Sequence, residues 1–218
     1  MSGPLERIPA VVLATRVIAS VDAGLAAALN LAPQQTAIAL LTTDCDDVGY
    51  IAVDEATKKA NVEVVYAASF YAGAAHASGP FSGEFIGILA SDNPADAAAG
   101  LAAAVDFTQN DAAFEKAAPG GPAFLAHLVS SCGTYLATAG GIPVGTAMAY
   151  LIAPPLEATF GLDAALKAAD VKLIKHFPPP SETNFSGGWL AGSQAACQAA
   201  CDAFRDAVVS VAVAPIVF

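Results

Sequence analysis

Residues 54–65 read DEATKKANVEVV, and residues 162–174 read LDAALKAADVKLI. Each stretch has the pattern of a helix that ends at a small polar residue and runs directly into a β-strand. Val62 and Val171 are equivalent in the two stretches, an offset of 109 residues, which is half of the 218-residue chain. Two copies of one pattern indicate a duplicated domain and not a solenoid, so the chain is interpreted as two related halves.

The composition supports two small domains with much buried surface. Hydrophobic residues make up 56% of the chain and charged residues only 13%, below the roughly 25% of an ordinary soluble protein. So few charges cannot cover two separate small domains, and we expect burial between the halves and between subunits. The four cysteines lack zinc-site spacing and are expected to be buried, reduced thiols of a cytoplasmic protein.

The charge and the apolar runs exclude several classes of partner. The net charge of −11 argues against binding to nucleic acid or to an anionic membrane surface. No apolar run reaches the roughly 20 residues that span a bilayer, and residues 1–9 have no signal-peptide core.

The order of elements predicts an α+β fold in which each half is an antiparallel sheet flanked by helices. A cluster of breakers near 110–122 sets the boundary between a first domain, 1–112, and a second, 113–218. We expect strands near 11–21, 36–43, 50–53, 62–66, 81–89, 123–131, 148–153, 171–176 and 189–191, and helices at 23–31, after Asp54, 94–107, 135–138, after Leu162 and 193–211. Long segments rich in small residues or proline, 67–80 and 177–188, interrupt the two halves at the same topological place and are predicted to be functional loops.

Catalytic motifs are absent from the sequence. We find no glycine-rich phosphate loop, nucleophile elbow, His-Glu-x-x-His or Cys-x-x-Cys pattern. His127 lies in an apolar strand and is interpreted as a core or interface residue, while His76 and His176 lie in or beside the two long segments. His76 and His176 could approach each other and bind a metal, but the simpler interpretation is that they are exposed loop residues. No metal site or cofactor is predicted.

Acidic residues form the most informative polar group. Asp44, Asp46 and Asp47 follow a buried strand, and Glu84 interrupts another apolar run. A carboxylate inside an apolar strand needs a partner or a wet cavity. One interpretation is a capping cluster with an interface salt bridge. The other is an acidic pocket for a small ammonium ligand, with Phe114 as an aromatic wall and Glu182 as a further carboxylate.

Long strings of the sequence resemble the EutL family of ethanolamine-utilisation bacterial microcompartment shell proteins. The match covers nearly the whole chain. It is carried by TRVIASV (15–21), DCDDVGYIAVDEATKKANVEVVYA (44–67), FYAGAAHA (70–77), PLEATFGLDAALKAADV (155–171), PPPSETNFS (178–186) and GSQAACQAACDAF (192–204).

The resemblance implies two circularly permuted microcompartment domains, three chains in a ring that mimics a hexamer, and tiling with other shell proteins into the shell of a bacterial organelle. It implies a structural protein and not an enzyme. The long segments would surround a gated central pore, and glycines suit a moving gate. The residues assigned to this gate are Phe70, Tyr71, Gly73, His76, Gly79, Asn184 and Phe185.

The resemblance also implies small pores within each subunit that bind ethanolamine. The residues matched to that site are Asp46, Asp47, Glu84, Phe114, Glu182 and Thr183. The chain departs from the family where arginines are common, at Ala67-Ala68 and at 130–132, which affects the pore charge. The alternative function is a module that senses an ammonium ligand without transport; catalysis by an Asp46–Glu84 carboxylate pair would lack an orienting group.

Overall fold

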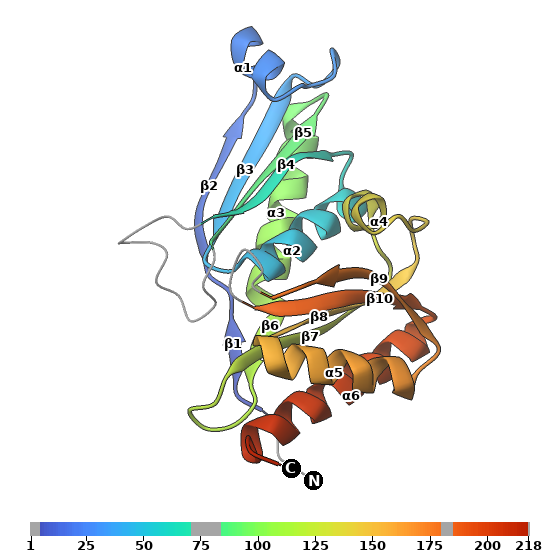
Figure 1. Cartoon of the computed structure of the whole chain (residues 1–218). Helices are drawn as coiled ribbons and strands as arrows, with labels where there is room; N and C mark the ends of the chain where they lie inside the picture. Colours follow the sequence, from blue (N-terminus) through green and yellow to red (C-terminus); the bar gives the residue numbers. More distant parts are fainter. Residues whose placement is uncertain (1–4, 71–83, 180–184, 218) are drawn as a thin grey trace. The chain divides into compact units, whose positions relative to one another are not determined.

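The computed structural model describes residues 5–70, 84–179 and 185–217, and it divides into two compact units. The first unit contains Met1–Ile8, Ala113–Cys132 and Ala139–Phe218, and the second contains Pro9–Ala112 and Gly133–Thr138. Each unit is an antiparallel sheet with helices packed on it (Figure 1). The predicted α+β class with two helix-flanked sheets is therefore confirmed.

The second unit is a sheet of order β2-β3-β5-β4, with α2 and α3 packed together beside it (Figure 1). Its strands are β2 (Val12–Ile18), β3 (Ala37–Thr43), β4 (Glu63–Phe70) and β5 (Glu84–Ser91). Its helices are α1 (Ala23–Ala28), α2 (Asp46–Lys59) and α3 (Pro94–Asn110). β3 is largely buried, with the pattern of a strand covered on both faces, as its uninterrupted apolar run predicts.

The first unit is a sheet of order β1-β6-β7-β8-β10-β9. Its strands are β1 (Arg7–Pro9), β6 (Ala113–Lys116), β7 (Ala123–Val129), β8 (Ala147–Ala153), β9 (Val171–Phe177) and β10 (Ser186–Gly192). Helices α5 (Pro155–Ala168) and α6 (Gln194–Val213) pack against each other and against β8. Their shared core includes Leu151, Leu162 and Phe204.

Backbone hydrogen bonds show the repeat directly. Val62 N–H donates to the Ala60 carbonyl, and Val171 N–H donates to the Ala169 carbonyl, both at 2.9 Å. These bonds place Val62 and Val171 at the same point, where a helix turns into a strand. The offset inferred from the sequence is confirmed, and α2 corresponds to α5.

The small residues of this sequence let the helices approach closely. A Cβ on Gly161 of α5 would lie 2.7 Å from the Phe204 ring of α6. A Cβ on Gly49 of α2 would collide with the ring of Phe85, which is fully buried. The low-charge, alanine-rich composition therefore produces tight layers, because interiors pack without gaps large enough to admit an extra methyl group.

The structure corrects several expected boundaries. The short strand expected at 50–53 is wrong, because these residues form the middle of α2, which begins at Asp46. The first helix ends at Ala28 and does not reach residue 31, since Asn30 has a φ of 54° and interrupts helical geometry. Near 110–122, where the domain boundary is expected, the chain forms the unpredicted strand β6, which joins the short strand β1 at the sheet edge. Residues 67–70, expected as loop, extend β4, and Phe177 and residues 186–188, from the other expected loop, belong to β9 and β10.

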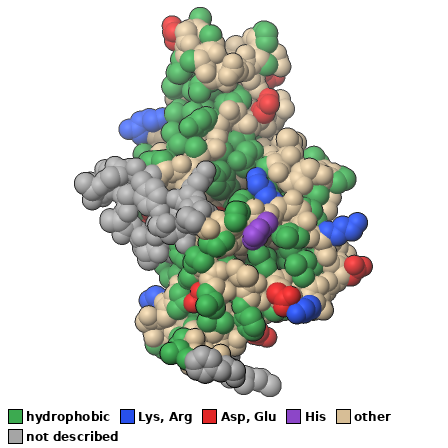
Figure 2. All heavy atoms as spheres, viewed as in Figure 1, with side chains coloured by type: hydrophobic (Ala, Val, Ile, Leu, Met, Phe, Trp, Pro, Cys, Tyr) green, Lys and Arg blue, Asp and Glu red, His purple; other side chains and the backbone are tan. Residues whose placement is uncertain are grey.

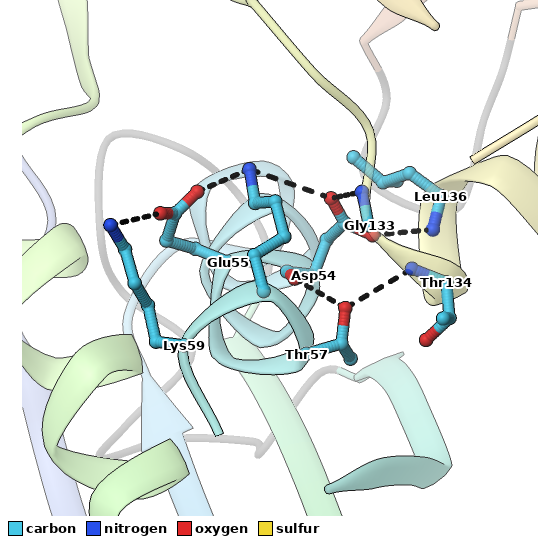
Figure 3. Close-up of polar contacts among 8 residues, drawn as sticks. Asp54, Glu55, Thr57, Lys59, Gly133, Thr134 and Leu136 are labelled. Atoms are coloured by element: carbon cyan, nitrogen blue, oxygen red, sulfur yellow. Dashed lines mark hydrogen bonds and ion pairs between the residues drawn. The ribbon is translucent and has the colours of Figure 1, made fainter. Parts of the chain in front are cut away.

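Helix α4 (Thr134–Gly140) begins with a segment that belongs to the second unit, although its sequence lies in the second half of the chain. We call Gly133–Thr138 the docked segment. Asp54 of α2 accepts two backbone N–H bonds from it, Gly133 N to Oδ2 at 2.7 Å and Leu136 N to Oδ1 at 2.8 Å (Figure 3). Both carboxylate oxygens of Asp54 therefore satisfy N–H groups at the start of a helix, where no intrahelical acceptor exists.

Further contacts hold the docked segment against α2. Thr57 Oγ1 accepts a bond from Thr134 N at 3.1 Å and donates to the Asp54 carbonyl at 2.7 Å (Figure 3). The Tyr135 ring stacks on Tyr50 with 6.3 Å between centroids, and Leu136 is fully buried. Burial raises the pKa of Tyr135 to about 12, with a smaller contribution from the Asp54 charge.

We expect Asp54→Ala to lower the free energy of unfolding by about 2–4 kcal/mol, because it leaves two buried N–H groups without acceptors. The matched control is Asp163→Ala at the repeat-equivalent position of α5. The Asp163 side chain is 60% exposed and pairs with Lys167, so its loss should change stability by less than about 1 kcal/mol. Urea unfolding measures both. Equal losses in the two variants would contradict the role of Asp54.

The contribution of Asp54 to the free energy of unfolding depends on pH, and the direction follows from its raised pKa. Burial raises the pKa of Asp54 above its ordinary value of 3.8, against the smaller lowering effect of the Leu136 and Gly133 N–H groups. The folded state therefore holds the Asp54 proton more tightly, and this contribution to stability falls as pH rises from 3.8 through the raised pKa. The stability difference between the wild type and Asp54→Ala should accordingly be larger at acid than at neutral pH.

Candidate functional site

The predicted acidic residues of the second unit lie at one end of its sheet. Asp46 and Asp47 form the first turn of α2, which follows directly on β3. Glu84 is the first residue of β5, and the next residue, Phe85, pairs with Thr43 at the end of β3. The register therefore brings the start of α2 and the start of β5 to the same edge.

These carboxylates are buried. The exposed fraction is 5% for Asp46, 6% for Asp47 and 4% for Glu84. Two negative charges in the first turn interact favourably with the helix dipole of α2, and Asp46 Oδ1 accepts a bond from Asp47 N at 2.9 Å. This agrees with the capping interpretation for Asp46. It leaves Glu84 to be explained.

Glu84 carries the unusual feature of this edge. Its Oε1 atom is buried and accepts no hydrogen bond from any residue that the structure describes. An unsatisfied carboxylate oxygen in the interior costs free energy, and native proteins almost always supply it with a donor. The arrangement is suited to a small ligand that brings N–H or O–H groups and a positive charge.

Asp44 and Cys45 directly precede the cluster in the sequence. Asp44 receives a bond from Val11 N at 2.6 Å, and burial raises its pKa. Burial raises the pKa of the Cys45 thiol well above its ordinary value, and the charges of Asp47 and Asp46 raise it further. Cys45 is therefore a neutral thiol at the start of α2 and not a nucleophile.

The other predicted ligand residues are placed separately. Phe114 lies on β6 in the first unit, is 1% exposed, and contacts the Phe185 ring at 6.0 Å between centroids. Glu182 and Thr183 lie outside the described residues. The structure thus brings Asp46, Asp47 and Glu84 to one edge and Phe114 and Phe185 together, each pair or group within its own unit.

The predicted gate residues are described only at their edges. Phe70 ends β4 and pairs with Glu84, so the chain enters the first long segment beside the acidic edge. The ring of Tyr50 supports this end of β4, since its hydroxyl accepts a bond from Ser69 N at 2.9 Å. Phe185 directly precedes β10. The remaining gate residues, Tyr71, Gly73, His76, Gly79 and Asn184, lie outside the described residues.

Sequence reasoning missed two features of functional interest, Asp54 with its docked segment and an aromatic group on the first unit. In the latter, Trp189 packs with Tyr150 and Phe177, with 5.3 Å between centroids in each pair, and Lys175 Nζ lies 4.7 Å from the Trp189 ring centroid. The signal that could have indicated this aromatic group is the Lys-x-Phe pattern at 175–177, followed by a strand that contains Trp189.

The cysteines and the described histidines lie as follows in the structure. Cys45, Cys132, Cys197 and Cys201 are all free and buried, as expected, and burial raises the pKa of Cys201 to about 12. His127 is half-buried on β7, and His176 is exposed on β9. Across residues 5–70, 84–179 and 185–217, no group of three or more His, Cys, Asp or Glu side chains is arranged to hold a metal ion.

The surface has few charges. Figure 2 shows one face on which a few acidic and basic side chains are scattered among hydrophobic ones. Several large apolar side chains are more than half exposed, among them Leu156 and Phe160 of α5. Within the described part of the chain, no helix combines the length and apolarity that crossing a bilayer requires.

Comparison with known proteins gives consistent results. No protein-family model matches the chain. The bacterial microcompartment shell protein EutL of Salmonella typhimurium strain LT2 is 55% identical over 213 residues, covering 97% of both chains. The crystal structure of the ethanolamine utilization protein EutL from Leptotrichia buccalis is 55% identical, with a TM-score of 0.92 over 98% of this chain and 99% of that one.

A more distant structure shares the fold. The trimeric bacterial microcompartment shell protein PduB is 21% identical, with a TM-score of 0.78 over 90% of this chain and 87% of that one. Identity of 55% over nearly the full length, together with the duplicated sheet-and-helix layers, establishes the relationship with EutL. The chain belongs to the EutL family of bacterial microcompartment shell proteins, which are structural proteins and not enzymes.

Proposed function

We propose that this chain forms closed rings of three copies in the shell of an ethanolamine-utilising microcompartment. The observation that carries the proposal is the duplication, because three chains with two related units each provide six similar positions around an axis. The trimeric state of PduB, which shares the fold, supports the same assembly. In this proposal 1–112 and 113–218 are the two domains of the family.

A ring places identical segments of its copies around one axis. We therefore assign residues 67–80 and 178–188, from the two long segments, to a central pore that opens and closes for small metabolites or a cofactor. Phe70 and Phe185 lie within these segments and are the residues of the proposed gate that the structure describes. Small, glycine-containing segments suit a gate because glycine permits large backbone changes.

The acidic edge is proposed to bind ethanolamine. The ammonium group of ethanolamine supplies the positive charge and N–H donors that the buried Glu84 Oε1 lacks among the described residues. Asp46 and Asp47 add two carboxylates at the same edge. The assignment of Phe114, Glu182 and Thr183 to this ligand rests on the resemblance alone.

The ring is tested by the mass of the purified chain in solution. Size-exclusion chromatography with multi-angle light scattering should give three times the 21.8 kDa of one chain. The mass should persist on dilution into the micromolar range. A monomer at all concentrations would overturn the proposed assembly.

The ligand site is tested by isothermal titration of ethanolamine into the wild type and Glu84→Gln. We expect the variant to bind at least about ten-fold more weakly, since a charge-assisted hydrogen bond to a buried carboxylate is worth about 1.5–3 kcal/mol. Glu63→Gln is the matched control, because Glu63 is an exposed carboxylate of the same unit. Ethylene glycol, which lacks the ammonium group, should not bind.

Equal affinities of wild type and Glu84→Gln for ethanolamine would remove Glu84 from the site. That outcome would leave the shell role intact, since assembly and ligand binding are measured separately.

A further inference from the structure

Tyr50 of α2 connects the acidic edge of the second unit to the docked segment. It lies one turn after Asp46 and Asp47 on the same helix. Its ring and hydroxyl contact β4, β5 and the docked segment, which all belong to that unit. One side chain therefore touches both the strands that meet at Glu84 and the segment that Asp54 holds.

The contacts with the strands lie directly beside Glu84. The Tyr50 hydroxyl accepts a bond from Ser69 N at 2.9 Å, and its ring meets the Phe85 ring edge to face at 4.9 Å between centroids. Ser69 and Phe85 are paired in the sheet, and the next pair is Phe70 with Glu84. Tyr50 thus contacts both members of the pair that adjoins Glu84, so it helps to fix the backbone from which this carboxylate projects.

The contact with the docked segment is a parallel stack. The rings of Tyr50 and Tyr135 are inclined by 9°, with 6.3 Å between centroids, in the range of offset stacking. Tyr135 lies between Gly133 and Leu136, whose N–H groups are both bonded to Asp54. The buried carboxylate therefore fixes the backbone on both sides of Tyr135 and keeps its ring against Tyr50.

The other repeat shows that the fold does not require this arrangement. Offset by 109 residues, Asp46 and Tyr50 of α2 correspond to Pro155 and Thr159 of α5. Thr159 is exposed, and its hydroxyl donates to the Pro155 carbonyl of its own helix at 2.8 Å. Helix α5 has the same length as α2 without the carboxylate and without the aromatic ring.

The second ring of the stack is also missing from the other repeat. The N–H groups of Val21 and Cys132 each donate to a threonine carbonyl at 2.9 Å, at the same place in the two repeats. This register makes Gly24 the equivalent of Tyr135. Both rings of the stack thus occur only in the repeat that carries the acidic edge.

We propose that Tyr50 is a positioning residue of the acidic edge and that the docked segment, through Tyr135, sets the affinity of this edge for its ammonium ligand. The inference rests on the proposed ligand site and names the contacts that shape it. Tyr50 acts through Ser69 and Phe85 and not by touching the ligand. A carboxylate that is already held in place binds more tightly, because less ordering remains to be done when the ligand arrives.

Such a dependence is reciprocal. If the docked segment strengthens ligand binding at Glu84 by some factor, the bound ligand must stabilise the docked segment by the same factor. A stack that only stabilised the fold would give no ligand-dependent change at Gly133 and Leu136. The proposal can therefore be measured from either end.

The first measurement is isothermal titration of ethanolamine into the wild type and three variants. Tyr135→Ala removes the stack and keeps the backbone bonds to Asp54, so we expect it to bind about three-fold to ten-fold more weakly. Tyr135→Phe keeps the ring and should restore the affinity of the wild type. Thr134→Ala is the matched control in the same segment, because Thr134 is exposed and bonds to Thr57 through its backbone N–H.

The second measurement needs no variant that might fold poorly. Hydrogen–deuterium exchange of the wild type should show slower exchange at Gly133 and Leu136 in saturating ethanolamine than without it. Ethylene glycol at the same concentration should cause no such change. In Tyr135→Ala the effect of ethanolamine on these amides should be reduced or lost.

The outcomes separate this inference from the ligand site on which it rests. Equal affinities of the wild type and Tyr135→Ala for ethanolamine would overturn the role of the stack and leave the ligand site intact. Equal weakening by Thr134→Ala would do the same, since it would trace the effect to general loss of stability. Exchange at Gly133 and Leu136 that ignores bound ethanolamine would also overturn it. A wild type that does not bind ethanolamine would overturn the ligand site and this inference with it.

Discussion

The two N–H bonds accepted by the buried Asp54 carboxylate hold a segment of the second half of the sequence in the unit built by the first half. The carboxylate has no exposure to solvent, so its charge is stabilised by the Gly133 and Leu136 N–H groups and by Lys58, whose Nζ lies 3.9 Å away. This interaction needs glycine at position 133, because a side chain there would collide with Asp54 and Thr57. One local constraint thus makes the second unit depend on residues about 80 positions further along the chain.

The same constraint explains why a duplicated chain has unequal halves. The repeat gives α2 and α5 the same length and the same turn into a strand, yet only α2 has its outer face covered at Ile51 and Asp54. On α5 the repeat-equivalent of Ile51 is Phe160, which is 52% exposed, and α1 contains no buried residue. A shell protein needs such surfaces, since its role is to join copies of itself, and its 13% of charged residues leaves them uncovered.

Much of the fold could be predicted from the sequence because its signals are local. The apolar run of β3, Asn93-Pro94 at the start of α3, and the repeated helix-to-strand turn at Val62 and Val171 each depend on neighbouring residues. The prediction was wrong at 50–53, where the apolar residues Ile51 and Val53 resemble a strand but face partners from within a helix. Short strands β1 and β6 were missed because pairing at a sheet edge leaves little trace in three or four residues.

The candidate site, like the fold, could be predicted from the sequence only in part. Burial of Glu84 could be predicted, since one carboxylate stood in an apolar run, and the structure places it at the edge where α2 begins. The part played by Asp54 could not be predicted, because its partners Gly133 and Leu136 are 79 and 82 residues away and donate only backbone N–H groups. No side-chain type reports such a contact in a sequence.

The central claim is that the buried Asp54 carboxylate holds the docked segment in the second unit. Hydrogen–deuterium exchange of the wild type and Asp54→Ala tests it most directly. The account predicts that the amides of Gly133 and Leu136 are protected in the wild type and exchange faster in Asp54→Ala, while the amides of the first unit keep their protection. Equal protection of Gly133 and Leu136 in the two proteins would contradict it.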